Sequence, residues 1–481
     1  METETAQIDA GPSRHTVRSE DTPRQADARE GTLSPAGLVL AAVALGGAVQ
    51  VNFGQYHLRA LPWLTLALYL CAVSVAAPRA SFLRVLDRKI IWVVAIGLCV
   101  QFVLLLGVSP GATGRLAGRG AILWPFRAGV VAAAALTAGA LLLKGRAGRS
   151  CLLAMLLTHA ALGAWVLHAA PDPGVDVVVF QREASRALHE GKNPYAVTFL
   201  NLYSNPLKFY SPGALNEGRL NFGYPYPPLS LLLALPGYLL GDFRYAQLIA
   251  MTAAGALIAL ARPGRLATSA AAVLLFTPRG FFVLEAGWTE PFAVLLLAAT
   301  VFIACRRPRA LPVPLGLLIA VKQYLALALV LSPLLSTRFR QKHRSLAWKA
   351  LGIAAAVTLP MAVWDLGAFV RSAMLLQFRQ PFREDSLSYP AAIYWSTGWR
   401  GPAWVAFVLA AVAVAYCLRK CPRTPAGFAA ALGLVCFVFF AFNKQAFCNY
   451  YHLVIGALCC AAGASAPVDP PTACEPENTP D

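Results

Sequence analysis

The chain has 481 residues, of which 58% are hydrophobic and only 13% are charged, and its mean hydropathy is +0.58. Soluble domains carry about 25% charged residues, so this composition excludes a soluble globular protein. The formal net charge is +18, but Lys and Arg gather in short loops between apolar runs, as the positive-inside rule predicts. We therefore expect membrane lipids as partners and no nucleic acid.

The spacing of cysteine and histidine indicates no metal site. The eleven cysteines are scattered, several lie inside apolar runs, and there is no CxxC pair, so we interpret them as small buried hydrophobic residues. The chain also has no Gly-rich phosphate loop and no paired D-x-D motif. We expect no cofactor and no metal.

The ends of the chain differ from its middle. Residues 1–34 are polar, lack the apolar core of a signal peptide and are predicted to be a disordered cytosolic tail, as are residues 466–481. Between them we expect an all-α polytopic fold with about 12 membrane crossings. Residues 35–149 are predicted to form a four-helix transmembrane bundle, and residues 150–465 a second transmembrane module. The predicted spans cover residues 35–53, 61–77, 90–107, 121–143, 151–170, 243–261, 267–284, 288–304, 345–363, 402–418, 425–442 and 450–465.

The basic loops set the orientation of these spans. If all of them face the cytosol, four polar segments share the outer face. The basic loops are Arg79 to Lys89, Lys144 to Arg149, Arg262 to Arg265, Arg306 to Arg309, Arg338 to Lys349 and Arg419 to Arg423. The outer segments are then residues 171–222, 285–291, 364–401 and 443–449. We look for function on that face.

Two apolar runs do not fit as simple crossings. Residues 226–241 are short and rich in Pro, and residues 311–334 lie between two basic loops with Lys322 near their midpoint. A lone Lys in mid-span costs about 2.5–3.5 kcal/mol on insertion scales. We expect both runs to be re-entrant or half-membrane segments, which are tolerated where they line a cavity. This predicts a cavity around Lys322.

The largest outer segment, 171–222, begins with a candidate catalytic acid. Asp176 starts a helix-like stretch in which Phe180 and Ala184 share one face with Ala187 and Leu188, and charged residues take the other. We expect this amphipathic helix to lie along the bilayer surface. The alternative role of Asp176 is an N-cap, for which Asp is a preferred residue. Asp172 and Glu183 are weaker candidates for the acid.

The other outer segments supply cations and aromatic rings. The sequence QFRQPFREDSLSY places Arg383 beside two acids, which suits either phosphate binding or an exposed salt-bridged turn. The sequence FNKQAFCNYYH collects Lys444, His452 and tyrosines that could equally be interfacial anchors. Glu285 and Glu290 flank a third outer turn, and Glu290 could cap the next span. This inventory predicts attack by an acceptor hydroxyl on a donor with a phosphate leaving group, with a carboxylate as general base.

The pattern resembles the GT-C superfamily of integral membrane glycosyltransferases, and within it the polyprenol-phosphate-mannose-dependent branch, glycosyltransferase family 87. The similarity covers residues 150–465. It rests on Asp176 early in the first large outer loop, EGKNPY at 190–195, YPPL at 226–229, and GLLIAVKQYLALALVLSPLL at 316–335 with Lys322.

The resemblance implies an inverting transferase of a prokaryotic cytoplasmic membrane, with its site on the outer side. A polyprenyl-phosphate sugar, by this branch mannose, would be the donor and a lipid or glycan hydroxyl the acceptor. Asp176 becomes the candidate base and Lys322 a phosphate contact. Further candidate substrate- or phosphate-binding residues, added from their position and chemistry, are Arg383, Lys444, His452, Tyr195, Tyr226 and Gln323.

Three other functions stay open. A transporter of lipid-linked sugars would share basic pockets and broken helices, but many transporters have repeated halves with a midplane site, and we find no internal repeat. A polysaccharide ligase or polymerase also uses large outer loops with Arg. A protein of the same fold could bind lipid-linked glycans without turnover.

Overall fold

The computed structural model describes residues 33–113, 116, 122–335 and 340–465. Nearly all of the regular structure in these ranges is helical, which confirms the all-α class. The predicted tails lie outside the described residues except for residues 33 and 34. Ser34 is the N-cap of the first helix, because its hydroxyl accepts a hydrogen bond from the backbone N–H of Gly37 at 3.2 Å.

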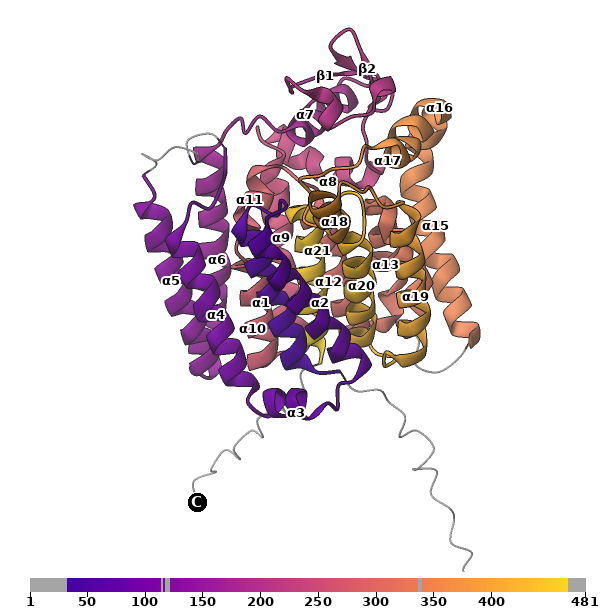
Figure 1. Ribbon diagram of the computed structural model, residues 1–481. Helices are drawn as coiled ribbons and strands as arrows, with labels where there is room; N and C mark the ends of the chain where they lie inside the picture. The colour runs from indigo at the N-terminus through magenta and orange to yellow at the C-terminus, as the bar shows by residue number, and fades with distance from the viewer. Residues whose placement is uncertain (1–32, 114–115, 117–121, 336–339, 466–481) are drawn as a thin grey trace, which may run out of the picture.

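The first part of the chain, up to the outer segment 171–222, is helical (Figure 1). A short basic helix, α3, lies at the end where the predicted cytosolic loops gather. The helices up to the outer segment are α1 (Pro35–Val51), α2 (Leu61–Ala76), α3 (Ser81–Arg88), α4 (Ile90–Gly107), α5 (Trp124–Leu142) and α6 (Gly145–Ala169). The five helices other than α3 correspond to predicted spans, although α6 begins six residues earlier than expected, and α3 lies in the predicted basic loop from Arg79 to Lys89.

The second part of the chain surrounds the most buried helices, α20 and α21. Helix α21 packs against α1, α10, α12 and α20. The principal helices are α8 (Pro228–Leu239), α9 (Arg244–Ala261), α10 (Arg265–Leu275), α11 (Gly280–Glu285), α12 (Glu290–Arg306), α13 (Pro312–Val321), α14 (Leu327–Leu331), α15 (Arg340–Trp364), α16 (Leu366–Phe369), α17 (Leu376–Arg379), α18 (Tyr389–Thr397), α19 (Trp404–Lys420), α20 (Pro425–Ala441) and α21 (Cys448–Ala464).

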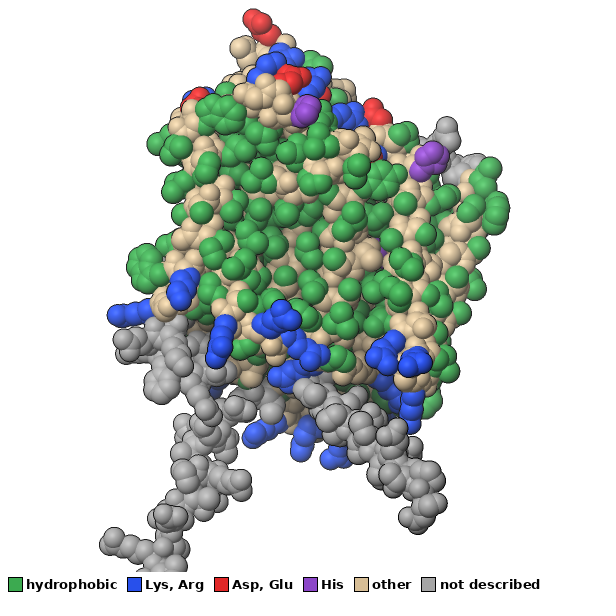
Figure 2. All heavy atoms as spheres, turned by 180° about the vertical axis from the view of Figure 1, so that it is seen from behind, with side chains coloured by type: hydrophobic (Ala, Val, Ile, Leu, Met, Phe, Trp, Pro, Cys, Tyr) green, Lys and Arg blue, Asp and Glu red, His purple; other side chains and the backbone are tan. Residues whose placement is uncertain are grey.

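Length and hydropathy identify the protein as membrane-embedded. Six helices of the described chain are long and apolar enough to span a bilayer, and several apolar helices are shorter. Figure 2 shows a broad band of hydrophobic side chains, with Lys and Arg gathered at the end opposite to α7. The spanning helices include residues 58–76, 90–107, 124–142, 145–169, 244–261 and 344–364.

A small polar layer covers the other end of the molecule (Figure 1). It consists of α7 (Asp176–His189) and a three-stranded antiparallel sheet of β1 (Phe199–Leu200), β3 (Arg219–Leu220) and β2 (Leu215–Asn216), in that order. Phe199 pairs with Leu220, and Phe180 of α7 packs 4.8 Å from the Phe199 ring. The amphipathic helix is confirmed, with Phe180, Ala184 and Ala187 on its buried face.

Two breaks in the helices depart from simple crossings. The predicted span 267–284 is wrong as one helix: α10 ends at Leu275, and α11 begins at Gly280. Pro278 lies in this gap, and Pro lacks the N–H that a continuous helix requires. The second break is at Lys322, which is extended between α13 and the next 3-10 turn, Gln323–Ala326. A break at the Lys of this run was expected.

Candidate functional site

A cavity of about 290 Å³ lies beneath the polar layer, where α7, the sheet loops and the broken helices meet. Its wall brings together residues that are far apart in the sequence. Asp176 comes from α7, Lys322 from the break after α13, and Arg383 from the segment after α17. The expected cavity around Lys322 is thus present, and the candidate base shares it.

Asp176 is held by the aromatic loop that covers it. It is the first residue of α7, after the N-cap Val175, so the alternative that Asp176 is the N-cap is wrong. The Tyr210 hydroxyl donates to Oδ2 at 2.7 Å, and the Val177 backbone N–H donates to Oδ1 at 2.8 Å. The Tyr203 hydroxyl accepts from the Asp176 backbone N–H at 3.4 Å. These contacts fix the carboxylate at the cavity wall.

The surroundings of Asp176 shift the pKa of its carboxyl upward. Burial raises the pKa of the Asp176 carboxyl, and the Tyr210 and Val177 hydrogen bonds only partly oppose this shift. Burial and the nearby carboxylate also raise the pKa of the Tyr210 phenol well above its usual value. Tyr210 therefore stays protonated and donates its hydrogen to Asp176. Arg383, in the same wall, slightly lowers the Asp176 pKa.

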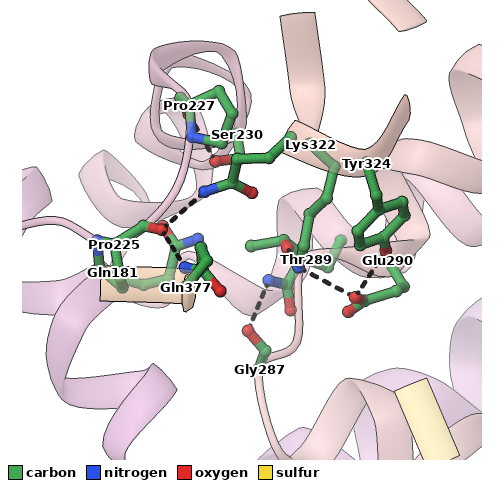
Figure 3. Close-up of polar contacts among 12 residues, drawn as sticks. Gln181, Pro225, Pro227, Ser230, Gly287, Thr289, Glu290, Lys322, Tyr324 and Gln377 are labelled. Carbon is green, nitrogen blue, oxygen red and sulfur yellow. Dashed lines mark hydrogen bonds and ion pairs between the residues drawn. The ribbon is translucent and has the colours of Figure 1, made fainter. Parts of the chain in front are cut away.

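Lys322 is paired with a buried acid. Its Nζ lies 2.9 Å from Glu290 Oε1 and 2.6 Å from Thr289 Oγ1, and the Tyr324 hydroxyl donates to the same Glu290 oxygen at 3.2 Å (Figure 3). The side chains of Lys322 and Glu290 are only 6% and 0% exposed. Lys322 also lies over the Tyr226 ring, 4.3 Å from its centroid. The proposed role of Glu290 as a helix cap is wrong, since Thr289 takes that position.

A second cavity of about 350 Å³ adjoins the first and shares Lys322, Tyr226 and Tyr450 with it. Its other wall is largely apolar and comes from the first turn of α19 and the last turn of α20. Phe407 of α19 is 51% exposed on the hydrophobic band, while Phe440 of α20 is buried. The second cavity therefore connects Lys322 with the lipid-facing surface.

Arg383 is sandwiched and already paired. Its guanidinium lies 4.5 Å from the Phe209 ring and 4.7 Å from the Phe447 ring. It donates to both oxygens of Asp385, at 2.8 and 2.9 Å, and Lys208 lies 3.3 Å from the same carboxylate. Burial alone would raise the Asp385 pKa, but Arg383 and Lys208 outweigh it and lower that pKa. The predicted salt-bridged turn exists, but it is largely buried.

Lys444 lines the second cavity without a carboxylate partner in the described chain. Its Nζ donates to the backbone carbonyls of Phe378 and Gln380, at 3.1 and 2.5 Å. Partial burial lowers the pKa of the Lys444 ammonium. Lys444 therefore brings positive charge to the second cavity, whose wall is largely apolar.

Two of the other predicted residues, Tyr226 and Gln323, line the cavities, and a third, Tyr195, contacts one of them from behind. Tyr226 lines both cavities, and Gln323 lines the second. Gln323 Nε2 donates to Pro225 O at 2.9 Å, and the Tyr195 hydroxyl donates to Tyr226 O at 2.8 Å. Tyr195 is buried and reaches neither cavity, so the structure gives it a positioning contact only. The NPY turn and the YPYPPL run are thereby held together.

His452 is also absent from both cavity walls. It lies on α21, is 2% exposed, and neither of its ring nitrogens has a hydrogen-bond partner in the described structure. The structure thus brings Asp176, Lys322, Arg383 and Tyr226 to one cavity, and Lys444 and Gln323 to the adjoining one. No group of three or more His, Cys, Asp or Glu side chains suited to a metal occurs among the described residues.

The segment after α1 completes the cavity wall. Phe53 and Gln55 line the first cavity, and Gln55 forms an isolated bridge with Ser386. Gly54 has φ of +73°, and a Cβ there would lie 2.4 Å from the Cys448 backbone nitrogen. Only Gly fits this approach without strain. The segment that follows the first helix therefore contributes directly to the site.

Sequence reasoning missed four contributors, namely Glu290 as the Lys322 partner, Tyr210, Phe53 and Gln55. Glu290 could have been predicted from the sequence. A Lys inside an apolar run is expected to pair with an acid, and few acids lie at the outer ends of the predicted spans. Tyr210 and Phe53 had none, since their places depend on how distant segments fold together.

No family model, no curated protein and no solved structure matches this chain. The functional interpretation therefore rests on the residues and geometry of this site.

Proposed function

We propose that this protein is a membrane glycosyltransferase that moves a sugar, by resemblance mannose, from a polyprenyl-phosphate donor to a hydroxyl of a lipid or glycan acceptor. The observation that carries the proposal is the pair of joined cavities. One holds a carboxylate with a raised pKa, the other leads to the lipid-facing surface, and Lys322 stands where they meet. The reaction would take place on the side opposite to the basic end.

In this proposal Asp176 removes the proton from the acceptor hydroxyl as that oxygen attacks the anomeric carbon. A general base is most effective when its pKa lies near the working pH. Burial moves the Asp176 pKa in that direction, and Tyr210 fixes its orientation. The bond from the anomeric carbon to the phosphate oxygen breaks, and its electrons leave with the phosphate.

The leaving phosphate would lie at the junction of the cavities. Lys322 faces both of them, and Lys444 lines the apolar one without a carboxylate partner in the described residues. Cations near a developing phosphate charge lower the barrier of the transfer step. The polyprenyl chain would lie along the apolar wall near Phe407 and Phe440, which contacts the bilayer side.

The first cavity has the chemistry of a sugar site. Aromatic rings dominate its wall, and carboxamides are the commonest polar groups beside the three charged residues. Rings pack against the apolar faces of sugars, and carboxamides both donate to and accept from hydroxyls. The carboxamides are those of Gln55, Gln377, Gln380, Gln445 and Asn449.

The test is sugar transfer from radiolabelled polyprenyl-phosphate-mannose in membranes that contain wild type, Asp176→Asn or Asp172→Asn. Asp176→Asn keeps the side-chain shape and removes the base, so we expect transfer to fall about 10²–10⁴-fold. Asp172 is a matched control because its side chain is 77% exposed and makes only a 3.9 Å ion pair with Arg182.

Full activity of Asp172→Asn with loss in Asp176→Asn supports the proposal. Transfer that survives in Asp176→Asn contradicts the role of this residue as the base. Absence of transfer by wild type contradicts this donor and favours the ligase or transporter alternatives.

A further inference from the structure

Glu290, the partner of Lys322, and His452 of α21 are buried polar side chains with no role in the reaction described above. Glu290 Oε2 and both ring nitrogens of His452 have no hydrogen-bond partner in the described structure. Glu290 is 0% exposed and His452 is 2% exposed. Buried polar atoms without partners are rare and costly, so these three atoms call for an explanation.

The packing of α12 against α21 brings both side chains to the interface between these helices. The helices touch at Val294 and Gly456, where a Cβ on Gly456 would lie 2.7 Å from Val294 Cγ1. Side chains four residues apart share one helix face. Glu290 is four residues before Val294 and His452 is four residues before Gly456, so both project from the same seam, one turn nearer the outer end. Glu290 is close enough for its charge to act on the imidazole.

The cations near this interface are already paired with acids or with backbone carbonyls, so an anion that binds there brings uncompensated charge. Lys322 is neutralised by Glu290, and Arg383 by Asp385. Lys444 is half-buried at the other side of the second cavity and already donates to two carbonyls. The titratable groups whose charges interact with Glu290 are Lys322, Tyr226, Tyr324, Tyr450, Cys448 and His452. Those whose charges interact with His452 are Glu290 and His159.

A phosphodiester bound at Lys322 therefore adds one negative charge beside the buried Lys322–Glu290 ion pair, whose two charges already cancel. Uncompensated charge in a low-dielectric interior is strongly unfavourable. A proton on His452 restores neutrality, because the imidazolium can donate to the free oxygen of Glu290 while Lys322 turns its charge to the phosphate. Among the described residues, His159 Nε2 is the other ring nitrogen without a partner, but the His159 ring already contacts Thr252 Oγ1 through Nδ1.

We propose that Glu290 and His452 form a proton-accepting pair, so that binding of the donor phosphate at Lys322 is coupled to uptake of one proton by His452. This rests on the proposed function, since it assumes an anionic donor at Lys322. His452 and Glu290 act through Lys322 and are positioning residues. Their coupling makes donor binding weaken as pH rises.

The experiment is titration calorimetry of the full-length purified protein with farnesyl phosphoryl mannose, a phosphodiester that does not itself titrate near neutral pH. Measurements at pH 8 in HEPES and in Tris, whose ionisation enthalpies differ, give the number of protons bound. We expect uptake of about one proton and a dissociation constant that rises about tenfold per pH unit above neutrality.

His452→Gln is expected to bind the probe without proton uptake and with a flat pH dependence. His168→Gln is the matched control, because it removes an exposed histidine of α6 and should behave like wild type. His452→Asn is a second variant if His452→Gln does not fold, and the wild-type proton count needs no variant.

Binding by wild type without proton uptake overturns this inference and leaves the proposed function intact. Uptake that persists in His452→Gln also overturns it, because the proton then goes to another group such as Asp176. No binding by wild type refutes the proposed function and this inference together.

Discussion

Loss of the Glu290 charge is expected to destabilise the protein, because it leaves a buried cation without its counter-ion. Glu290→Gln keeps the shape of the side chain and an oxygen for Lys322 and Tyr324. The Lys322 ammonium, only 6% exposed, then faces no negative charge in its pair. Removal of one partner of a buried ion pair costs about 3–5 kcal/mol. Because Gln still accepts a hydrogen bond, we expect Glu290→Gln to lower the free energy of unfolding by about 3 kcal/mol.

The double variant separates the ion pair from the packing. Lys322→Met fills a similar volume without charge, and replacement of a whole buried pair by apolar residues is often neutral. Glu290→Gln combined with Lys322→Met should therefore be more stable than the sum of the single changes predicts, by about 2–3 kcal/mol. The assay is unfolding of the purified protein by SDS in mixed micelles, followed by tryptophan fluorescence.

The matched control is Glu190→Gln, which breaks the Lys192–Glu190 pair on the surface. Those side chains are 67% and 43% exposed, so water and salt screen their interaction, and we expect no measurable change in stability. Additive effects of Glu290→Gln and Lys322→Met would refute the reasoning, because they would show that the two charges do not stabilise each other.

Three further changes test the walls of the site. Tyr210→Phe removes a hydrogen bond that lowers the Asp176 pKa, so the acid limb of the pH–rate profile should move to higher pH, and a shift to lower pH would contradict the assignment. Gly54→Ala should lower the melting temperature and the transfer rate, because Ala at positive φ costs about 1–2 kcal/mol and its methyl group would clash with the Cys448 backbone. A melting curve like that of wild type would contradict this prediction. Lys444→Met should raise KM for the polyprenyl-phosphate donor with a smaller effect on kcat, and an unchanged KM would exclude it from donor binding.

The sequence by itself determined the class and the outline of the fold. Apolar runs of about 20 residues have only the helix available inside a bilayer, because every backbone polar group must be satisfied within the segment. The amphipathic spacing after Asp176 predicted α7, and the charge of Lys322 in an apolar run predicted both the helix break and a cavity beside it. These are local properties, which residue type and spacing control.

Helix continuity was less accessible to sequence reasoning. The span 267–284 was expected as one helix, but the chain unwinds around Pro278 and Arg279 takes φ of +66°. The Arg279 guanidinium packs 3.6 Å from the centre of the Phe53 ring, and it donates to the Ser109 carbonyl at 2.8 Å. Contacts with α1 and with the segment after α4 stabilise this conformation, and they are invisible in the local sequence.

Only the tertiary structure decided which residues meet. Asp176 and Lys322 are 146 positions apart. Their residue types indicate their chemistry, but nothing in the sequence indicates the distance between them. Tyr210 reaches Asp176 because a sheet of three two-residue strands folds the loop back, and Glu290 reaches Lys322 because the first turn of α12 lies beside the break after α13. Hydropathy places segments in a membrane, but the packing of side chains between helices sets which polar groups share a cavity.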